Sequence, residues 1–336
     1  MNLIIPKNYK SSLSARETQD AIKFVRTRFE QRLSSALNLS RVTAPVFVAA
    51  GEGINDDLSG SERKVDFTMK NLKGVTAEIV QSLAKWKRIA LSKYDFKVGE
   101  GLYTNMNAIR RDDDIDNLHS IYVDQWDWEL VIDKGQRKLA FLEEVAKKIV
   151  SEIVLTSKEV TEKFPALGQS KLSEKVLVIS SQELEDKYPN LSAKERENKI
   201  VKEHKSVVLT QIGGKLKSGK PHDSRAPDYD DWSMNCDILF WCDVLDCAVE
   251  ISSMGIRVDE AALKAQLKIA GCEDRSKLKY HKMLLEGELP LTIGGGIGQS
   301  RVCLLLLNKA HLGEVHASIW SKEMVEECRR NGIEIL

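Results

Sequence analysis

Four glycines stand within five residues near the end of this chain, in Ile293-Gly294-Gly295-Gly296-Ile297-Gly298. Gln299-Ser300-Arg301 follows, and then the apolar run Val302-Cys303-Leu304-Leu305-Leu306-Leu307. Glycine lets the backbone come close to a ligand and adopt positive φ. The pattern predicts a glycine loop followed by a buried helix that ends near Gly313. An arginine at such a helix entrance suits a phosphate or a nucleotide.

Two common nucleotide-binding motifs do not fit this loop. The dinucleotide motif G-x-G-x-x-G needs a glycine where Gln299 or Arg301 stands, and the phosphate-loop motif G-x-x-x-x-G-K-S/T is absent. The simplest alternative is a tight strand-to-helix turn without a ligand. Taken alone, the glycines favour that alternative.

The charge balance narrows the range of partners. Lys+Arg and Asp+Glu both total 50, so the net charge is zero, which argues against an extended surface for nucleic acid or an anionic membrane. The longest apolar run has six residues and cannot cross a bilayer. We expect a soluble cytoplasmic protein with one domain over residues 1–336, without a nucleic-acid or membrane partner.

Hydrophobic periodicity predicts an α+β fold with a mainly antiparallel sheet flanked by helices. Helices are predicted over Ser14–Leu37, Ala84–Leu91, Arg137–Leu155, Ala193–Glu203, Asp259–Ala270 and Asp274–Leu285. Strands are predicted over Val42–Ala50, Glu78–Leu83, Leu102–Arg110, His119–Glu129, Lys175–Ser180, Ser206–Ile212, Asp237–Trp241 and Asp246–Ser252. An acidic turn over residues 111–117 joins the third and fourth strands into a hairpin, and residues 213–232 form a loop.

The strand His119–Glu129 alternates strictly at its end. Gln125, Asp127 and Glu129 share one face, while Asp124 and the two tryptophans share the other. Two carboxylates and an amide on one face would be awkward in a core and natural in a ligand site. A solvent-facing strand explains the same pattern about as well.

Three further segments have both a functional and a structural explanation. The cations of Gln81–Arg88 form either a solvated helix face or an anion pocket, and the loop Asp223–Trp232 is either functional or a surface crossing. Asp237 or Glu250 could hold Mg²⁺ beside a nucleotide, and a structural salt bridge is the alternative.

Read in order, these pieces resemble one family, the ammonia-dependent asparagine synthetases (aspartate–ammonia ligases). The catalytic fold of that family is like that of class II aspartyl- and asparaginyl-tRNA synthetases. The matching stretches are Asp57-Leu58-Ser59-Gly60, Ser82-Leu83-Ala84-Lys85-Trp86-Lys87-Arg88, Gly99-Glu100-Gly101-Leu102-Tyr103-Thr104, Tyr122-Val123-Asp124-Gln125-Trp126-Asp127-Trp128-Glu129, Gly213-Gly214-Lys215-Leu216, Arg225-Ala226-Pro227-Asp228-Tyr229-Asp230-Asp231-Trp232, Ser252-Ser253-Met254-Gly255-Ile256-Arg257 and the glycine loop. They cover nearly the whole chain, and several are diagnostic individually.

The resemblance implies roles for individual residues. Arg110 and Arg301 are similar to the arginines on the two sides of ATP, beside Gly294, Gly295, Gly296 and Gly298. The positions that bind the amino acid are matched by Ser82, Lys87, Gln125, Asp127, Ser253 and Arg257. Asp127 would take the α-ammonium and Lys87 a carboxylate. Asp56 and Asp230 match acids near the reacting end of the substrate.

The implied reaction converts L-aspartate, ATP and ammonia to L-asparagine, AMP and pyrophosphate through β-aspartyl-AMP, with Mg²⁺. The implied assembly is a homodimer that uses the first helix and the strand beside Pro45. One alternative is a class II-like ligase that acts on tRNA, against which stand the zero net charge and the lack of an appended anticodon-binding region. Another is a non-catalytic paralogue that senses aspartate or AMP.

Overall fold

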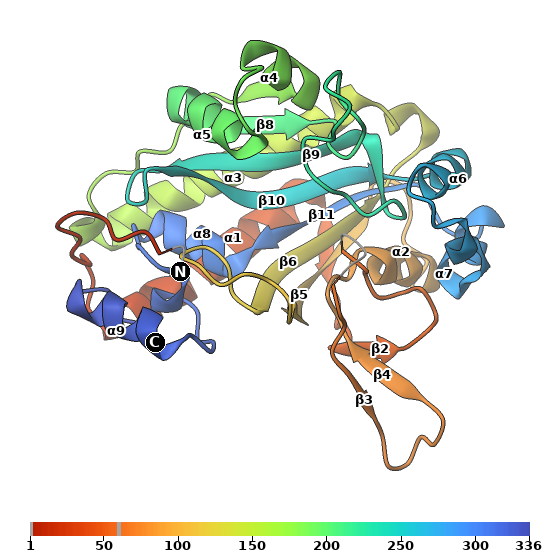
Figure 1. Ribbon diagram of the computed structural model, residues 1–336, viewed down its shortest axis with the longest axis horizontal. Helices are drawn as coiled ribbons and strands as arrows, with labels where there is room; N and C mark the ends of the chain where they lie inside the picture. The colour runs from red at the N-terminus through yellow and green to blue at the C-terminus, as the bar shows by residue number, and fades with distance from the viewer. Residues whose placement is uncertain (1–2, 59–61) are drawn as a thin grey trace.

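The computed structural model describes residues 3–58 and 62–336, and its centre is an eight-stranded sheet (Figure 1). Ser59 and Gly60, part of one matching stretch, lie outside the described residues. In spatial order the strands are β1 (Leu39–Arg41), β5 (Gly101–Ile109), β6 (Tyr122–Val131), β11 (Thr292–Gly298), β10 (Cys247–Arg257), β9 (Asp230–Cys242), β8 (Ser206–Thr210) and β7 (Leu177–Ser180). Only the edge pairs β1–β5 and β7–β8 are parallel. The mainly antiparallel sheet with flanking helices is confirmed.

Three helices cover one face of this sheet: α1 (Ala15–Leu37), α3 (Leu139–Lys163) and α8 (Gln299–Leu306). Ser14 begins α1 with a reciprocal capping box to Glu17, as expected for a helix that starts at this serine. The apolar side of α1 is buried here, and Phe29 packs its ring 4.8 Å from that of Trp126 on β6. The predicted alternation of β6 is confirmed, because Trp126 and Trp128 point into this core.

The opposite face is covered only at its two sides. Helix α2 (Ala84–Lys93) packs over β5, β6 and β11, while α4 (Ser181–Lys187) packs over β7 and α5 (Ala193–His204) over β8, β9 and the first residues of β10. Helices α6 (Glu260–Ile269) and α7 (Lys279–Leu285) lie beside α2, and α9 (Lys322–Arg330) lies near both chain ends (Figure 1). The middle of this face, over β6, β11 and β10, carries the polar side chains described below. Within residues 3–58 and 62–336, no helix has the length and apolar character needed to cross a bilayer.

A second, three-stranded sheet projects from the molecule next to α2 (Figure 1). Its order is β2 (Phe47–Ala49), β4 (Thr76–Ile79), β3 (Asp66–Thr68), and both pairs are antiparallel. The prediction of one strand over the whole of Val42–Ala50 is wrong, because only Phe47–Ala49 forms a strand there. The chain leaves β1 after Arg41, and Pro45, which lacks a backbone donor, lies in the connection before β2 in the other sheet.

The glycine segment is also not a loop. Gly294, Gly295, Gly296 and Gly298 all belong to β11 and have no positive φ. The helix that follows ends at Leu306 rather than near Gly313, because the chain turns at Asn308 with a left-handed φ of 52°.

Other boundaries differ by a few residues. Strand β4 ends at Ile79, β9 already begins at Asp230 within the predicted loop, and β10 continues to Arg257. Strands β1 and β3 and helices α4 and α9 were not predicted. The extension of β9 and β10 matters most, since it places Asp230 opposite Arg257 in the strand register.

Candidate active site

A buried ion network lies between α2 and the middle of the sheet. Lys87 on α2 points at β6, where its Nζ pairs with the Asp127 carboxylate and donates to the Trp128 carbonyl at 3.0 Å. It also donates to the Gly295 carbonyl on β11 at 3.0 Å. These three contacts match the three donors of an ammonium group, so Lys87 joins α2, β6 and β11 at one point. The second Asp127 oxygen is buried and has no hydrogen-bond partner among the described residues.

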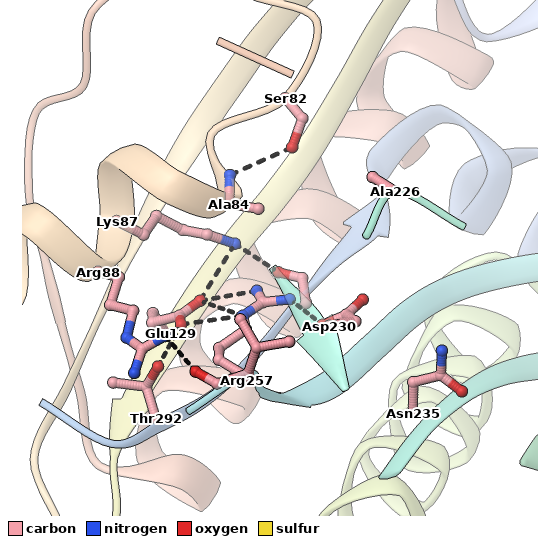
Figure 2. A network of polar contacts seen from close by, with 12 residues as sticks. Ser82, Ala84, Lys87, Arg88, Glu129, Ala226, Asp230, Asn235, Arg257 and Thr292 are labelled. Atoms are coloured by element: carbon pink, nitrogen blue, oxygen red, sulfur yellow. Dashed lines mark hydrogen bonds and ion pairs between the residues drawn. The ribbon is translucent and has the colours of Figure 1, made fainter. Parts of the chain in front are cut away.

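Glu129 and Arg257 form the second part of the network (Figure 2). Arg257 Nη2 lies 2.7 Å from Glu129 Oε2, Nε lies 3.0 Å from Oε1, and Thr292 donates to the same Oε1 at 2.7 Å. On its other side Arg257 pairs with Asp230. Burial alone would raise the pKa of Glu129, but the charge and hydrogen bonds of Arg257, followed by Lys87, hold it below its ordinary value.

The glycines of β11 explain how these side chains fit. A Cβ on Gly294 would overlap the Glu129 carboxylate, and one on Gly296 would overlap the Gln125 amide. On β10, a Cβ at Gly255 would lie 2.6 Å from an Asp230 oxygen. The glycines therefore clear space above the sheet for charged side chains, rather than forming a turn.

A cavity of about 520 Å³ opens on the same face next to this network. Arg110, at the end of β5, and Arg301, on the first turn of α8, both line it. Arg110 Nε donates to the Gln81 carbonyl at 3.2 Å, while Arg301 Nη1 donates to the Glu250 carbonyl at 2.9 Å. The two guanidinium groups thus reach one cavity from different elements, as the predicted nucleotide role requires.

The cavity and the buried network meet at shared residues. Gln125 and Gly296 line the cavity, and each is next to the network on its own strand. Gly298 lines the cavity where β11 passes into α8. Ser253 on β10 stands opposite Gly296, and Ser82 accepts a hydrogen bond at 3.1 Å from the Ala84 amide where α2 begins. The structure thus gathers both predicted residue sets on one face of the sheet.

Asp237 and Glu250 lie on adjacent strands, and Glu250 lines the cavity. Asp237 pairs with Arg225, but its Oδ1 is buried and without a partner in the described parts of the chain. Burial raises the pKa of Asp237, and the charge of Glu250 adds to this against the effect of Arg225. If a nucleotide occupies the cavity, these two carboxylates could hold Mg²⁺, which takes one or two carboxylates together with substrate oxygens and water. No group of three or more His, Cys, Asp or Glu residues suited to a metal occurs in the searched residues 3–58 and 62–336.

Asp56 lies buried in the connection between β2 and β3 of the small sheet. Its Oδ1 accepts from the Leu58 amide at 3.0 Å, and its backbone carbonyl accepts from Gln81 Nε2 at 3.0 Å. Burial raises the pKa of Asp56; the positive charge of Lys85 lowers it and the negative charge of Asp228 raises it further. A carboxylate with a raised pKa is a better proton acceptor than an ordinary one.

Sequence reasoning missed a buried cluster next to Asp56. The Oδ2 of Asp228 is approached by Lys85 Nζ at 3.1 Å, His281 Nε2 at 3.0 Å and Arg275 Nη1 at 3.2 Å. These residues come from α2, α7 and the preceding 3₁₀ turn, and no local spacing in the chain connects them. Glu129 was recognised as part of a polar face but was not assigned a site role, although it is the partner of Arg257.

Comparison with known proteins agrees with this geometry. The aspartate-ammonia ligase family model matches residues 16–332. An aspartate–ammonia ligase of Ligilactobacillus salivarius is 58% identical over all of both chains, and one of Clostridium perfringens is 57% identical over 99% of each.

Solved class II synthetases share the fold at low sequence identity. The asparaginyl-tRNA synthetase of Pyrococcus horikoshii, complexed with asparaginyl-adenylate, has a TM-score of 0.67 at 13% identity, over 91% of this chain and 70% of its own. The corresponding Entamoeba histolytica complex has a TM-score of 0.64 at 11% identity, over 90% of this chain and 66% of its own. The chain thus spans about two thirds of these synthetases. With the family model matched over nearly its whole length and full-length relatives at more than half identity, this chain belongs to the aspartate–ammonia ligase family, on the fold of class II aminoacyl-tRNA synthetases.

Proposed function

We propose that this protein makes L-asparagine from L-aspartate, ATP and ammonia through β-aspartyl-AMP. The proposal is carried by one observation: two half-sites, the cavity and the buried ion network, lie directly next to each other. The cavity with Arg110 and Arg301 adjoins the ion network of Asp127 and Arg257, and Gln125 with Gly296 lies between them. A nucleotide in the cavity and an amino acid in the network would have their reacting groups side by side.

The network suits a substrate with one ammonium and two carboxylate groups. The partnerless oxygen of Asp127 can accept a hydrogen bond from the α-ammonium. Lys87 and Arg257 supply positive charge for the carboxylates, and their donors also contact Asp127, Glu129 and Asp230. We assign aspartate to this place, with its β-carboxylate directed toward the cavity.

In the first step a β-carboxylate oxygen bonds to the α-phosphorus of ATP, and pyrophosphate leaves with the electrons of the broken P–O bond. Both partners are anionic, so Arg110 and Arg301 lower the barrier by stabilising the charge that develops on phosphorus. Mg²⁺, held by Asp237 and Glu250, would neutralise part of the triphosphate charge. Holding the carboxylate against phosphorus supplies further acceleration through positioning.

In the second step the nitrogen must be uncharged. Asp56 takes a proton from ammonium, the ammonia nitrogen bonds to the carbonyl carbon of the activated β-carboxyl group, and AMP leaves with the electrons of the broken C–O bond. The nitrogen then loses a second proton to give the amide. Asp56 is preferred over Asp230 as the acceptor, because Asp230 is already paired with Arg257.

A homodimer and a cytoplasmic location belong to the same proposal. The apolar residues of α1 are used in the chain's own core, so they do not form the interface expected from sequence. The small sheet instead exposes Val46, Phe47 and Phe67 beside Pro45, with Leu72 and Val75 nearby. This apolar patch supports a self-association surface at the predicted strand.

Product analysis tests the function. Purified protein with aspartate, ATP, Mg²⁺ and ammonium should form asparagine, AMP and pyrophosphate in equal amounts. Stoichiometric ADP and phosphate would contradict an adenylate. Product formation that requires tRNA would favour the ligase alternative, and nucleotide binding without turnover would favour the sensor.

A further inference from the structure

Three buried acceptor oxygens lie around the Asp56 loop without a donor. Asp56 Oδ2, Gln81 Oε1 and Asp228 Oδ1 have no hydrogen-bond partner in the described segments, and each of the three residues is at most 1% exposed. Leaving buried acceptors unpaired costs free energy, so each of these oxygens is expected to have a hydrogen-bond donor.

The three side chains belong to one neighbourhood. Gln81 Nε2 donates to the Asp56 carbonyl at 3.0 Å, which places the amide of Gln81 beside Asp56. Lys85, one turn further along the chain, lies 3.1 Å from the other oxygen of Asp228, and its charge acts on both carboxylates. The carboxylates of Asp56 and Asp228 therefore lie together near Lys85, and the Gln81 amide lies beside Asp56.

The charged groups of this cluster differ in how deeply they are buried. Two fully buried carboxylates, Asp56 and Asp228, face one buried ammonium group, that of Lys85. Arg275 lies 3.2 Å from both Asp228 and Asp57, and Asp57 also pairs with Lys64 at 2.7 Å. The three ions added here bring the formal count to three carboxylates and three cations, so the case for a further donor rests on the three unpaired acceptor oxygens. Acceptor oxygens of two carboxylates and one amide fit a small cation that carries several N–H donors.

We propose that Asp56 Oδ2, Gln81 Oε1 and Asp228 Oδ1 form the site that binds the ammonium substrate. Ammonium has four N–H donors and no acceptor, whereas one water can donate to only two of these oxygens. The site holds the cation beside Asp56, the residue assigned above as its proton acceptor. The inference rests on the proposed function, because it assigns the nitrogen substrate of that reaction to named atoms.

Paired variants of Gln81 test this assignment kinetically. Gln81→Met removes Oε1 and also Nε2, whereas Gln81→Glu keeps an acceptor oxygen, replaces the Nε2 donor by a second oxygen and adds a negative charge. The half-saturating ammonium concentration should rise about tenfold or more in Gln81→Met, because a hydrogen bond to a charged group is worth at least this factor. It should not rise in Gln81→Glu, because an acceptor oxygen is kept and the added negative charge attracts the cation. Aspartate-dependent pyrophosphate exchange, which needs no ammonium, should change by less than about twofold in both.

Equal loss in the two variants would assign the effect to the bond that supports the Asp56 loop, and would overturn the proposal. Asp228 is left intact because its other oxygen holds Lys85, His281 and Arg275.

A crystallographic experiment tests the ammonium site independently of the proposed function. Thallium(I) has a size and charge close to those of ammonium and is visible by its anomalous scattering. In crystals with thallium(I) acetate, a peak should lie within contact of the three oxygens and should disappear in excess ammonium. Absence of that peak would overturn the site. If wild-type pyrophosphate exchange is normal in that case, the proposed function stands without this ammonium site. If exchange itself is absent, the proposed function fails.

Discussion

At the scale of single residues, the two arginines of the cavity carry the clearest prediction. Arg110→Ala and Arg301→Ala should each lower aspartate-dependent pyrophosphate exchange by about 10²–10³-fold, because each removes preorganised positive charge from the phosphorus under attack. Circular dichroism should be unchanged, since both side chains bond only to backbone carbonyls in the described structure. A folded variant with near wild-type exchange would remove that arginine from the site.

A substitution at Asp56 should affect the two half-reactions differently. Asparagine is nearly the same size but accepts no proton, so Asp56→Asn should keep pyrophosphate exchange and lower asparagine formation by roughly 10²-fold. Higher pH should partly restore formation, because more ammonia is then already uncharged. Equal loss of both half-reactions would make Asp56 a general binding residue.

The pH profile of the wild type follows from the same group. Burial raises the pKa of Asp56, so its base form is lost as pH falls through a value above that of an ordinary aspartate. Asparagine formation should therefore fall on acidification before the exchange reaction does. Identical acid limbs for the two reactions would contradict this role.

Sequence reasoning identified site residues where a local pattern marks them. The alternation of β6 was sufficient to place Gln125, Asp127 and Glu129 together on one face. The cluster around Asp228 could not be found in this way, because Lys85 and His281 lie 143 and 53 residues away and share no periodic pattern with it.

At the scale of elements, β11 makes the site possible. Gly294→Ala would push a methyl group into the Glu129 carboxylate and break its pair with Arg257. Disrupting a buried ion pair typically costs about 3–5 kcal/mol, so denaturant unfolding should show a loss of that order. Gly214→Ala is the control, because a Cβ there meets nothing within 4 Å and φ is not positive, and it should be neutral. Equal stability of the two variants would contradict the packing described here.

The glycine strand was predicted as a loop for a physical reason. Glycine usually marks turns, and the evidence that these glycines face Glu129, Gln125 and Met254 lies on neighbouring strands. By contrast, α1 was predicted almost to the residue, because its capping serine and its apolar face are both local signals. Elements whose cause is local were predictable, and those set by cross-strand packing were not.

At the scale of the whole molecule, the oligomeric state can be tested at the apolar surface of the small sheet. Phe47 and Phe67 stack edge to face at 5.3 Å on the small sheet, and their side chains are 48% and 38% exposed. Sedimentation should show a dimer at micromolar concentration, and Phe47→Asp should shift it toward monomer. Lys264→Asp, at an exposed position of α6 away from the small sheet, introduces the same acid and should leave the dimer intact. An active wild-type monomer would refute the dimer.

The fold class could be predicted from the amino-acid sequence, because motifs spread along the chain point to one family. The way in which the cavity and the ion network join could not be predicted from the sequence. That junction depends on the register of β6, β11 and β10, which places Gln125, Gly296 and Ser253 side by side.

An isotope-transfer measurement tests the central claim, that aspartate is activated as an acyl adenylate where these half-sites meet. Aspartate labelled with ¹⁸O in its β-carboxylate is converted to asparagine with unlabelled ATP and ammonium, and the products are analysed by mass spectrometry. The account predicts one ¹⁸O in the phosphate of AMP for each asparagine formed, because the bridging oxygen leaves with AMP. Label in inorganic phosphate together with ADP, or AMP without label, would contradict it.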